Sequence, residues 1–284
     1  MKKAIICIIA VIIILITAFQ IWKVNNINQK QVAVLVYHDI VKDPTKTNYE
    51  GDVLSSKEFE DELKYLKEKG YQSISVEELY EWKHDKKEIP DKSVVITFDD
   101  GFYSFKHIAQ PILKKYDYKA ICFLIGKTVG ETTPDYQEKV YGTIGIDEIK
   151  KHDANITYGS HTFNLHSKTD DGKPYVTAKS KEELENDTKK FKNTLFEPKY
   201  LAYPYYTYSK EYIEVLKDNN YYLAFAGEEE MATKHVDDFK VPRISGVKEF
   251  KNFKQIFETD KYRNKYGNGL IRKVILKIKR TLQK

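Results

Sequence analysis

Short apolar runs alternate with helix-like segments through the middle of the chain, and this alternation limits the possible folds more than any other feature. The run 93–98 (SVVITF) is typical, because it is apolar, rich in β-branched residues and long enough for one buried strand. Similar runs occur at 31–37, 119–125, 156–160, 200–203 and 221–226. Helix-like segments lie at 55–70, 104–116, 146–152, 181–196 and 209–219. This alternation predicts a single α/β domain with a parallel sheet.

Polar residues of the kinds found in enzyme sites follow four of these predicted strands, at the point where each strand ends. They are His38-Asp39, Asp99-Asp100-Gly101, His161 and Pro204-Tyr205. Parallel strands in a closed or nearly closed barrel bring their carboxyl ends together on one face, where barrel enzymes keep their sites. The pattern therefore predicts a barrel with these residues gathered at one end.

Two adjacent aspartates and two nearby histidines indicate a metal site. Asp99 and Asp100 follow a buried strand, where desolvation and mutual repulsion raise carboxyl pKa values unless a cation is bound. The alternative is an ordinary Asp-Asp-Gly turn. His161 and His166 can fold onto one ion, and a carboxylate completes the three protein ligands of an open catalytic site. We therefore expect Asp100, His161 and His166 to hold a divalent cation beside Asp99.

Segments 97–101 (TFDDG) and 160–166 (SHTFNLH) together resemble the polysaccharide deacetylase family, the NodB-type carbohydrate esterases. The resemblance extends over most of residues 32–245. It implies a distorted (β/α) barrel, expected to have seven strands. It also implies that Asp99 is the general base and that the metal ligands are Asp100, His161 and His166. Zinc is the expected metal, and cobalt, nickel and manganese are the alternatives.

Two details resemble one branch of this family, the poly-β-1,6-N-acetylglucosamine N-deacetylases. The family usually spaces its histidines as H-[ST]-x-x-H, whereas this chain has one residue more between His161 and His166. The branch carries its catalytic acid histidine near the N-terminus, in a permuted motif order, and here His38 follows Tyr37. No L-x-H sequence occurs after His166, in agreement with the permutation. His38 is therefore the candidate acid, and a structural histidine is the alternative.

Segment 201–205 (LAYPY) resembles the family segment whose backbone N–H, on the residue after proline, helps to form the oxyanion hole. The proline here is Pro204 and the donor is Tyr205. The usual following glycine is Tyr206, which either narrows the groove or requires a strained backbone, because glycine tolerates positive φ and tyrosine does not. The arginine often found before this segment is missing. Arg243 is a candidate for orienting Asp99, with a surface salt bridge as the alternative.

The first thirty residues predict a membrane anchor or an export signal. Lys2 and Lys3 precede an apolar run at 4–22 that is interrupted only by Thr17 and Gln20. At about 1.5 Å rise per residue this run comes close to spanning the hydrocarbon layer, and the preceding lysines place the N-terminus in the cytoplasm. A cleaved signal peptide is the alternative, although its cleavage site would be a poor match. Both interpretations export the domain, either to the outer face of the cell membrane or into the medium.

Positive charge is concentrated at the two ends of the chain. Residues 261–284 contain nine Lys or Arg and no acid, and residues 1–30 add four lysines. The net charge is +5, so residues 31–260 carry about −8, which argues against a nucleic-acid surface. Within 261–284, apolar residues recur at helical spacing opposite the lysines, as in a helix that binds an anionic membrane or an acidic wall polymer. The alternative is a helix packed on the domain itself.

The sequence therefore predicts an anchor or signal segment (1–30), a catalytic domain (31–260) and a basic tail (261–284). The resemblance implies a monomeric enzyme that removes acetyl groups from an extracellular N-acetylglucosamine polymer. Poly-β-1,6-N-acetyl-D-glucosamine, a biofilm exopolysaccharide, is the expected substrate, and cell-wall peptidoglycan is the alternative. Two other classes are a catalytically silent glycan-binding module and a structural anchor of a wall-assembly complex. The combination of Asp99 and His38 argues against the module, because a pure binder needs no base–acid pair.

Overall fold

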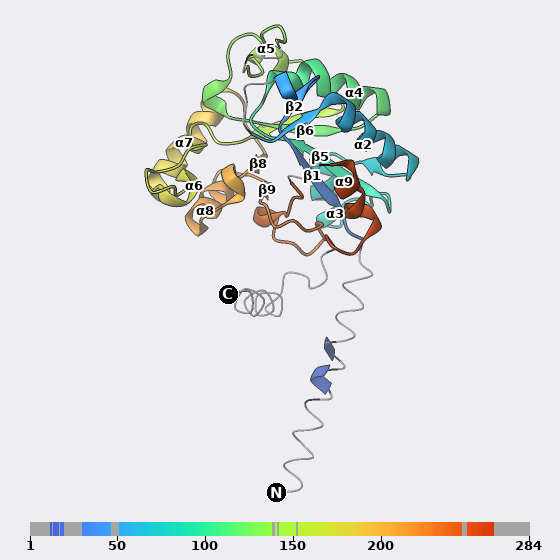
Figure 1. The fold of residues 1–284 in the computed structure, drawn as a ribbon. Coiled ribbons are helices and arrows are strands. Elements are labelled where there is room, and N and C mark those ends of the chain that lie inside the picture. Colours follow the sequence, from blue (N-terminus) through green and yellow to red (C-terminus); the bar gives the residue numbers. More distant parts are fainter. Residues whose placement is uncertain are drawn as a thin grey trace, which may run out of the picture.

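The computed structural model describes residues 30–46, 51–137, 140, 142–151, 153–245 and 249–263, with a few further positions between 12 and 19. These residues form a curled seven-stranded sheet, paired in parallel throughout, with helices around its outside (Figure 1). The strand order is β1 (Ala33–Tyr37), β5 (Ser93–Phe98), β6 (Ala120–Leu124), β7 (Ile156–Ser160), β8 (Tyr200–Ala202) and β9 (Leu223–Phe225). The remaining strand, β4 (Gln72–Ser73), pairs with the start of β5 and lies off this path.

A short segment at 241–244 closes the gap between β9 and β1. Val241 donates a backbone hydrogen bond to Ala224 of β9 at 3.0 Å and accepts one from Ala226, just after β9, at 2.8 Å. Ile244 exchanges two with β1, also of 2.8 and 3.0 Å. The expected distorted (β/α) barrel is confirmed. Six of the seven strands lie along the ring, β4 lies off it, and the segment 241–244 completes the ring without forming a regular strand.

The strands lie where the apolar runs predict them, with ends that differ by two residues or fewer. Every residue of β1, β5, β6 and β9 is buried. Strands that are covered on both faces have continuous apolar sequences, which explains why these runs do not alternate with polar residues. The short strands β2 (Asp39–Val41), β3 (Val53–Ser55) and β4 gave no such signal, and β2 and β3 form a separate parallel pair.

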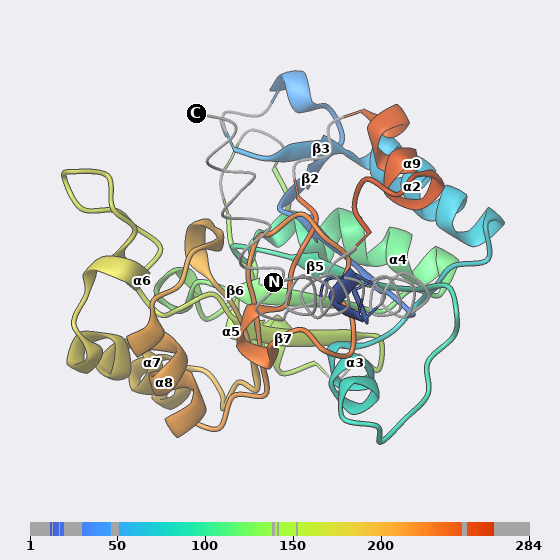
Figure 2. The same ribbon diagram turned by 90° about the horizontal axis from the view of Figure 1, so that it is seen from below.

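Helices surround the barrel in two groups. Figures 1 and 2 show α6, α7 and α8 on one side and α2, α4 and α9 on the other. The α-helices are α2 (Ser56–Glu68), α3 (Val76–Lys83), α4 (Gln110–Tyr116), α5 (Ile146–Ile149), α6 (Tyr175–Ala178), α7 (Lys181–Thr194), α8 (Lys210–Asp218) and α9 (Phe250–Glu258). Serine caps begin four of them (α2, α3, α7 and α8), and at α2 the Glu58 N–H donates to Ser55 Oγ at 3.1 Å.

The predicted helix at 104–116 contains a wider turn than an α-helix. Residues Phe105–Ala109 form a π-helical turn that leads into α4. Pro111 in the first turn of α4 has no N–H, so the preceding turn cannot be closed by the usual i→i−4 bond. Ser104, just before this turn, donates a 2.5 Å hydrogen bond to Asp39 and so ties the loop after β5 to β2.

The anchor predicted at 1–30 and the basic tail predicted at 261–284 fall almost entirely outside the described residues. Within the part of the chain that the structure describes, no helix is both long enough and apolar enough to cross a membrane. Both features therefore stay predictions from the sequence.

Candidate active site and metal centre

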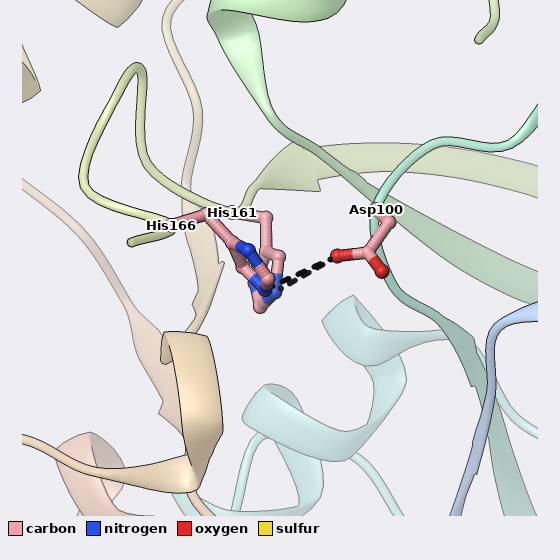
Figure 3. A group of neighbouring side chains, drawn as sticks. All are labelled: Asp100, His161 and His166. Carbon is pink, nitrogen blue, oxygen red and sulfur yellow. Dashed lines mark ion pairs between the residues drawn. The ribbon is translucent and has the colours of Figure 1, made fainter. Parts of the chain in front are cut away.

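The loops that follow β5 and β7 bring three potential metal ligands together at the carboxyl ends of the strands. Asp100 Oδ1 lies 3.4 Å from His161 Nε2 and 3.4 Å from His166 Nε2. Figure 3 shows both imidazole rings directed at the same carboxylate oxygen. One ligand atom from each side chain lies within 4.8 Å of the other two. The sequence predicted these three residues as a set, and the structure places them as one.

The chemistry of this cluster fits a divalent cation. Asp100 Oδ1 is buried and accepts no hydrogen bond from the described residues, so a carboxylate oxygen is left free to bind a cation. His161 Nδ1 lies 2.8 Å from the Ala202 carbonyl oxygen, which assigns the ring proton to Nδ1 and leaves the Nε2 lone pair facing Asp100. Burial lowers the pKa of His161 to about 4, so its ring is neutral at pH 7, as a metal ligand must be.

The loop that carries both histidines is held by α7. Asp187 on this helix accepts hydrogen bonds from the backbone N–H groups of Phe163 and Asn164, at 2.7 and 2.8 Å. Asp187 is itself 9% exposed, and burial raises its pKa although these two bonds oppose the shift. The sequence analysis missed this residue. Its signal was a carboxylate on the otherwise apolar face of a predicted helix, between Leu184 and Phe191.

Asp99 is paired with Arg243 inside the barrel. The guanidinium donates to both carboxylate oxygens, through Nη1 at 2.8 Å and Nη2 at 2.9 Å. Arg243 is 0% and Asp99 2% exposed, so the alternative of a surface ion pair is wrong. Burial alone would raise the pKa of Asp99, but the charge of Arg243 and its hydrogen bonds outweigh burial and hold that pKa below its usual range. The orienting role of Arg243 stays a prediction.

The segment after β8 contributes backbone in an unusual conformation. Tyr205 and Tyr206 have φ values of 55° and 59°, in the left-handed region that favours glycine. The Tyr205 N–H donates to no acceptor among the described residues, and its ring centroid lies 4.8 Å from that of His166. Pro204, before it, is buried. The expected strain at Tyr206 is therefore present, and the predicted oxyanion donor has no competing partner.

His38 follows β1 at the same end of the barrel. Its side chain is 14% exposed, and its Nδ1 lies 3.9 Å from the Asp52 carboxylate. A protonated His38 lies close enough to Asp99 to contribute to the lowering of the Asp99 pKa. It also lines a small cavity of about 60 Å³ between β1, α2 and α9. Its location is compatible with the role of a general acid, which stays a prediction.

Comparison with known proteins supports the family resemblance seen in the sequence. Residues 86–224 match a family model described as polysaccharide deacetylase. The chain carries a polysaccharide deacetylase domain. The matched range includes Asp99 and the three candidate metal ligands and leaves out His38 and Arg243. The expected enzyme class, a hydrolase of carbon–nitrogen bonds outside peptides, is confirmed with the family.

The deacetylase domain is similar to proteins named poly-beta-1,6-N-acetyl-D-glucosamine N-deacetylase. The protein from Staphylococcus epidermidis is 28% identical over 197 residues, which cover 67% of each chain. The protein from Staphylococcus aureus is 29% identical over 206 residues, again 67% of each.

Two solved structures share the fold of the deacetylase domain. IcaB from Ammonifex degensii superposes with a TM-score of 0.67 at 24% identity, over 80% of this chain and 95% of that one. A de-N-acetylase from Aggregatibacter actinomycetemcomitans gives 0.66 at 22%, over 80% and 100%.

Proposed function

We propose that the deacetylase domain hydrolyses the acetamide bond of N-acetylglucosamine units in extracellular poly-β-1,6-N-acetyl-D-glucosamine and releases acetate. The observation that carries this proposal is the unpaired Asp100 oxygen that faces two imidazole nitrogens, beside the buried Asp99 carboxylate. The names of the two staphylococcal relatives support the β-1,6-linked substrate. An extracellular location rests on the apolar run behind Lys2 and Lys3.

Asp100, His161 and His166 would hold the metal, and a mixed nitrogen and oxygen ligand set suits zinc, with cobalt, nickel or manganese as alternatives. When bound, such an ion polarises the acetamide carbonyl and lowers the pKa of water. The chain keeps the two histidine ligands in place before binding, through the Ala202 carbonyl behind His161 and through Asp187 behind the loop that carries both.

Asp99 acts as the general base on the attacking water. Its lowered pKa keeps it ionised over the whole working range of pH, at the cost of weak basicity. Each of its oxygens accepts one hydrogen bond from Arg243, which fixes the plane of the carboxylate and leaves further lone pairs for the proton of water. Arg243 thereby orients the base.

The Tyr205 N–H donates to the oxyanion of the tetrahedral intermediate. It has no protein acceptor among the described residues, and the left-handed backbone at Tyr205 holds the donor in a fixed direction. A preorganised donor of this kind contributes about 3–4 kcal/mol in other hydrolases. The Tyr205 ring packs on His166 and so keeps this segment against the loop after β7 that carries both histidines.

His38 protonates the departing amine. A well-placed general acid accelerates such a step by about 10²–10⁴-fold. The Asp52 carboxylate lies 3.9 Å from His38 Nδ1. The products are acetate and a glucosamine unit that remains in the polymer.

The decisive experiment measures acetate release by the full chain from poly-β-1,6-N-acetyl-D-glucosamine and from peptidoglycan, before and after chelation. We expect release from the first polymer, loss of release with chelator and recovery when zinc is added. Asp99→Asn should release no acetate, whereas Asp117→Asn, an exposed residue after α4, should behave as wild type.

Three outcomes would contradict parts of the proposal. Preferential release of acetate from peptidoglycan would show that peptidoglycan, and not poly-β-1,6-N-acetyl-D-glucosamine, is the substrate. Full activity after exhaustive chelation would show that the reaction needs no metal. Glycan binding without any acetate release would favour the binding module.

A further inference from the structure

Tyr206 occupies a backbone conformation in which tyrosine is strained. Its φ is 59°, and the preceding Tyr205 has a φ of 55°, so two successive residues with side chains lie in the left-handed region. Glycine adopts this conformation without the steric clash that a Cβ introduces. A tyrosine kept at this position therefore needs a compensating interaction in the folded structure.

The contact that Tyr206 makes is with the guanidinium of Arg243. The guanidinium carbon lies 5.3 Å from the centroid of the Tyr206 ring, and Phe123 lies 5.9 Å away. Arg243 is fully buried, so these contacts are shielded from water and stronger than at a surface. Burial is the main cause that raises the pKa of Tyr206 to about 12, so its hydroxyl stays neutral.

The hydrogen bonds of Arg243 do not by themselves fix its orientation. Nη1 and Nη2 bond to Asp99, and Nη1 also approaches Thr97 Oγ1 at 3.3 Å. Nε is buried and has no hydrogen-bond partner among the described residues. The guanidinium is therefore held at its far end only, and the tilt of its plane is set by the aromatic rings against it.

The space for Tyr206 is provided by a glycine that lies just after β9. A Cβ added at Gly227 would lie 2.4 Å from the Tyr206 Cβ and 2.5 Å from its Cγ. Both distances are far below van der Waals contact, so any side chain at 227 would displace the ring. The glycine is needed here for close approach rather than for its own φ. Gly227, Tyr206 and Arg243 thus form one packed unit behind the candidate base.

We propose that Tyr206 is a positioning residue, which holds the Arg243 guanidinium in the plane from which it donates two hydrogen bonds to Asp99. This inference rests on the proposed role of Asp99 as the general base. The ring, and not the hydroxyl, performs the function: the hydroxyl has no hydrogen-bond partner among the described residues, and Ser245 lies near it but outside hydrogen-bond geometry. Phenylalanine at position 206 should therefore preserve this function, and an aliphatic residue should not.

The test compares Tyr206→Phe, Tyr206→Leu and Tyr206→Gly in the full chain, with zinc supplied and acetate release measured. We expect Tyr206→Phe to keep kcat within about twofold, and Tyr206→Leu to lower kcat about tenfold with KM nearly unchanged. Tyr206→Gly should lose as much kcat as Tyr206→Leu but unfold at a higher temperature than Tyr206→Leu, because both lack the ring and only glycine relieves the strained φ. Tyr222→Leu, which removes a ring at the far end of β9, is the matched control and should not change kcat.

A double-variant cycle tests whether Tyr206 acts through Arg243. In an Arg243→Lys background the planar fork is lost, so Tyr206→Leu should lower kcat no further than about twofold. An undiminished tenfold loss in that background would overturn the proposal. So would a Tyr206→Leu enzyme with wild-type kcat, or a Tyr206→Gly enzyme that equals wild type.

Failure of the proposed function would be recognised separately, as a wild-type protein that releases no acetate from either polymer. In that case the crystal structure of Tyr206→Leu decides the inference. Loss of the two-bond geometry between Arg243 and Asp99 supports it, and an unchanged pair overturns it. Should the leucine variant fail to fold, Tyr206→Gly provides the same structural comparison.

Discussion

Arg243 donates two parallel hydrogen bonds to Asp99, at 2.8 and 2.9 Å, although the residues lie 144 positions apart in the chain. Arg243 belongs to the segment that closes the barrel between β9 and β1, and Asp99 follows β5. Closure of the barrel and orientation of the candidate base therefore depend on the same short segment.

Removal of Arg243 should destabilise the folded protein, because the Asp99 carboxylate stays buried without an opposite charge. We expect Arg243→Leu to lose about 3–5 kcal/mol of unfolding free energy in urea titrations, because Asp99 is left without its partner. Acetate release should fall about 100-fold or more as the carboxylate loses its orientation. The double variant Arg243→Leu with Asp99→Asn is the control and should recover much of the stability but none of the activity.

The loss of stability in Arg243→Leu should depend on pH. In wild type the pKa of Asp99 lies below its unfolded value, so its ionisation adds stability above about pH 4 that is lost as pH falls through the folded pKa. Without Arg243 the remaining burial raises this pKa, and the contribution changes sign. The difference between variant and wild type should therefore be largest near neutral pH and shrink toward pH 4. A difference that does not vary with pH would contradict the pairing.

Asp100→Asn tests two properties of Asp100 separately: its effect on the stability of the metal-free protein and its role in binding the metal. The Asp100 Oδ1 oxygen is buried without a partner, so neutralising it should raise the unfolding free energy of the metal-free protein by about 1–3 kcal/mol. Asparagine also accepts the φ of 70° at this position. Zinc should no longer raise the melting temperature of the variant. Wild-type zinc affinity, measured by calorimetry, would argue against ligation by Asp100.

The buried, neutral state of His161 should make the metal-free protein sensitive to acid. Burial lowers the folded pKa of His161 to about 4, below an unfolded value of about 6.5, so the unfolded chain binds the extra proton between these pH values. Stability should be complete above pH 6.5 and fall by up to about 1.4 kcal/mol per pH unit as pH drops toward 4. Urea midpoints measured in chelator should show this slope, and His161→Gln should remove it.

Asp187 should control metal affinity without touching the metal. Asp187→Ala deprives the Phe163 and Asn164 N–H groups of their acceptor, so the loop that carries His166 should loosen. We expect zinc affinity to fall about 10–100-fold, as is usual when groups behind metal ligands are removed. Glu185→Gln, on the exposed face of the same helix, is the matched control. Equal zinc affinities for the two variants would show that the loop holds its shape without Asp187.

His38→Gln tests the general acid. Acetate release should fall about 10²–10⁴-fold, while zinc affinity stays unchanged because His38 lies outside the ligand cluster. Asp52→Asn, which removes the nearby carboxylate, should lower kcat far less. An unaltered kcat in His38→Gln would remove this residue from the mechanism.

Several parts of the fold and site were predictable because their signals are local. The six main strands follow from apolar runs that must be buried on both faces. The metal cluster follows from residue types at strand ends, and parallel strands gather such ends on one face. Helix α6 was missed because four residues are too short for a periodic signal. Helices α3 and α9 were also missed, although a Ser75–Glu78 capping box begins α3 and the apolar residues of α9 recur at helical spacing.

The sequence by itself determined the strands, the polar residues at their ends and the family whose segments they match. Only the tertiary structure decided which distant groups meet: Arg243 with Asp99, Asp187 with the metal loop, and Tyr206 with Arg243 in the space left by Gly227. The physical reason is the range of each interaction. Burial patterns and turn signals lie at neighbouring positions of the sequence. These contacts join residues from different elements, 24 positions apart for Phe163 and Asp187 and 144 for Arg243 and Asp99, and they exist only after the barrel has formed.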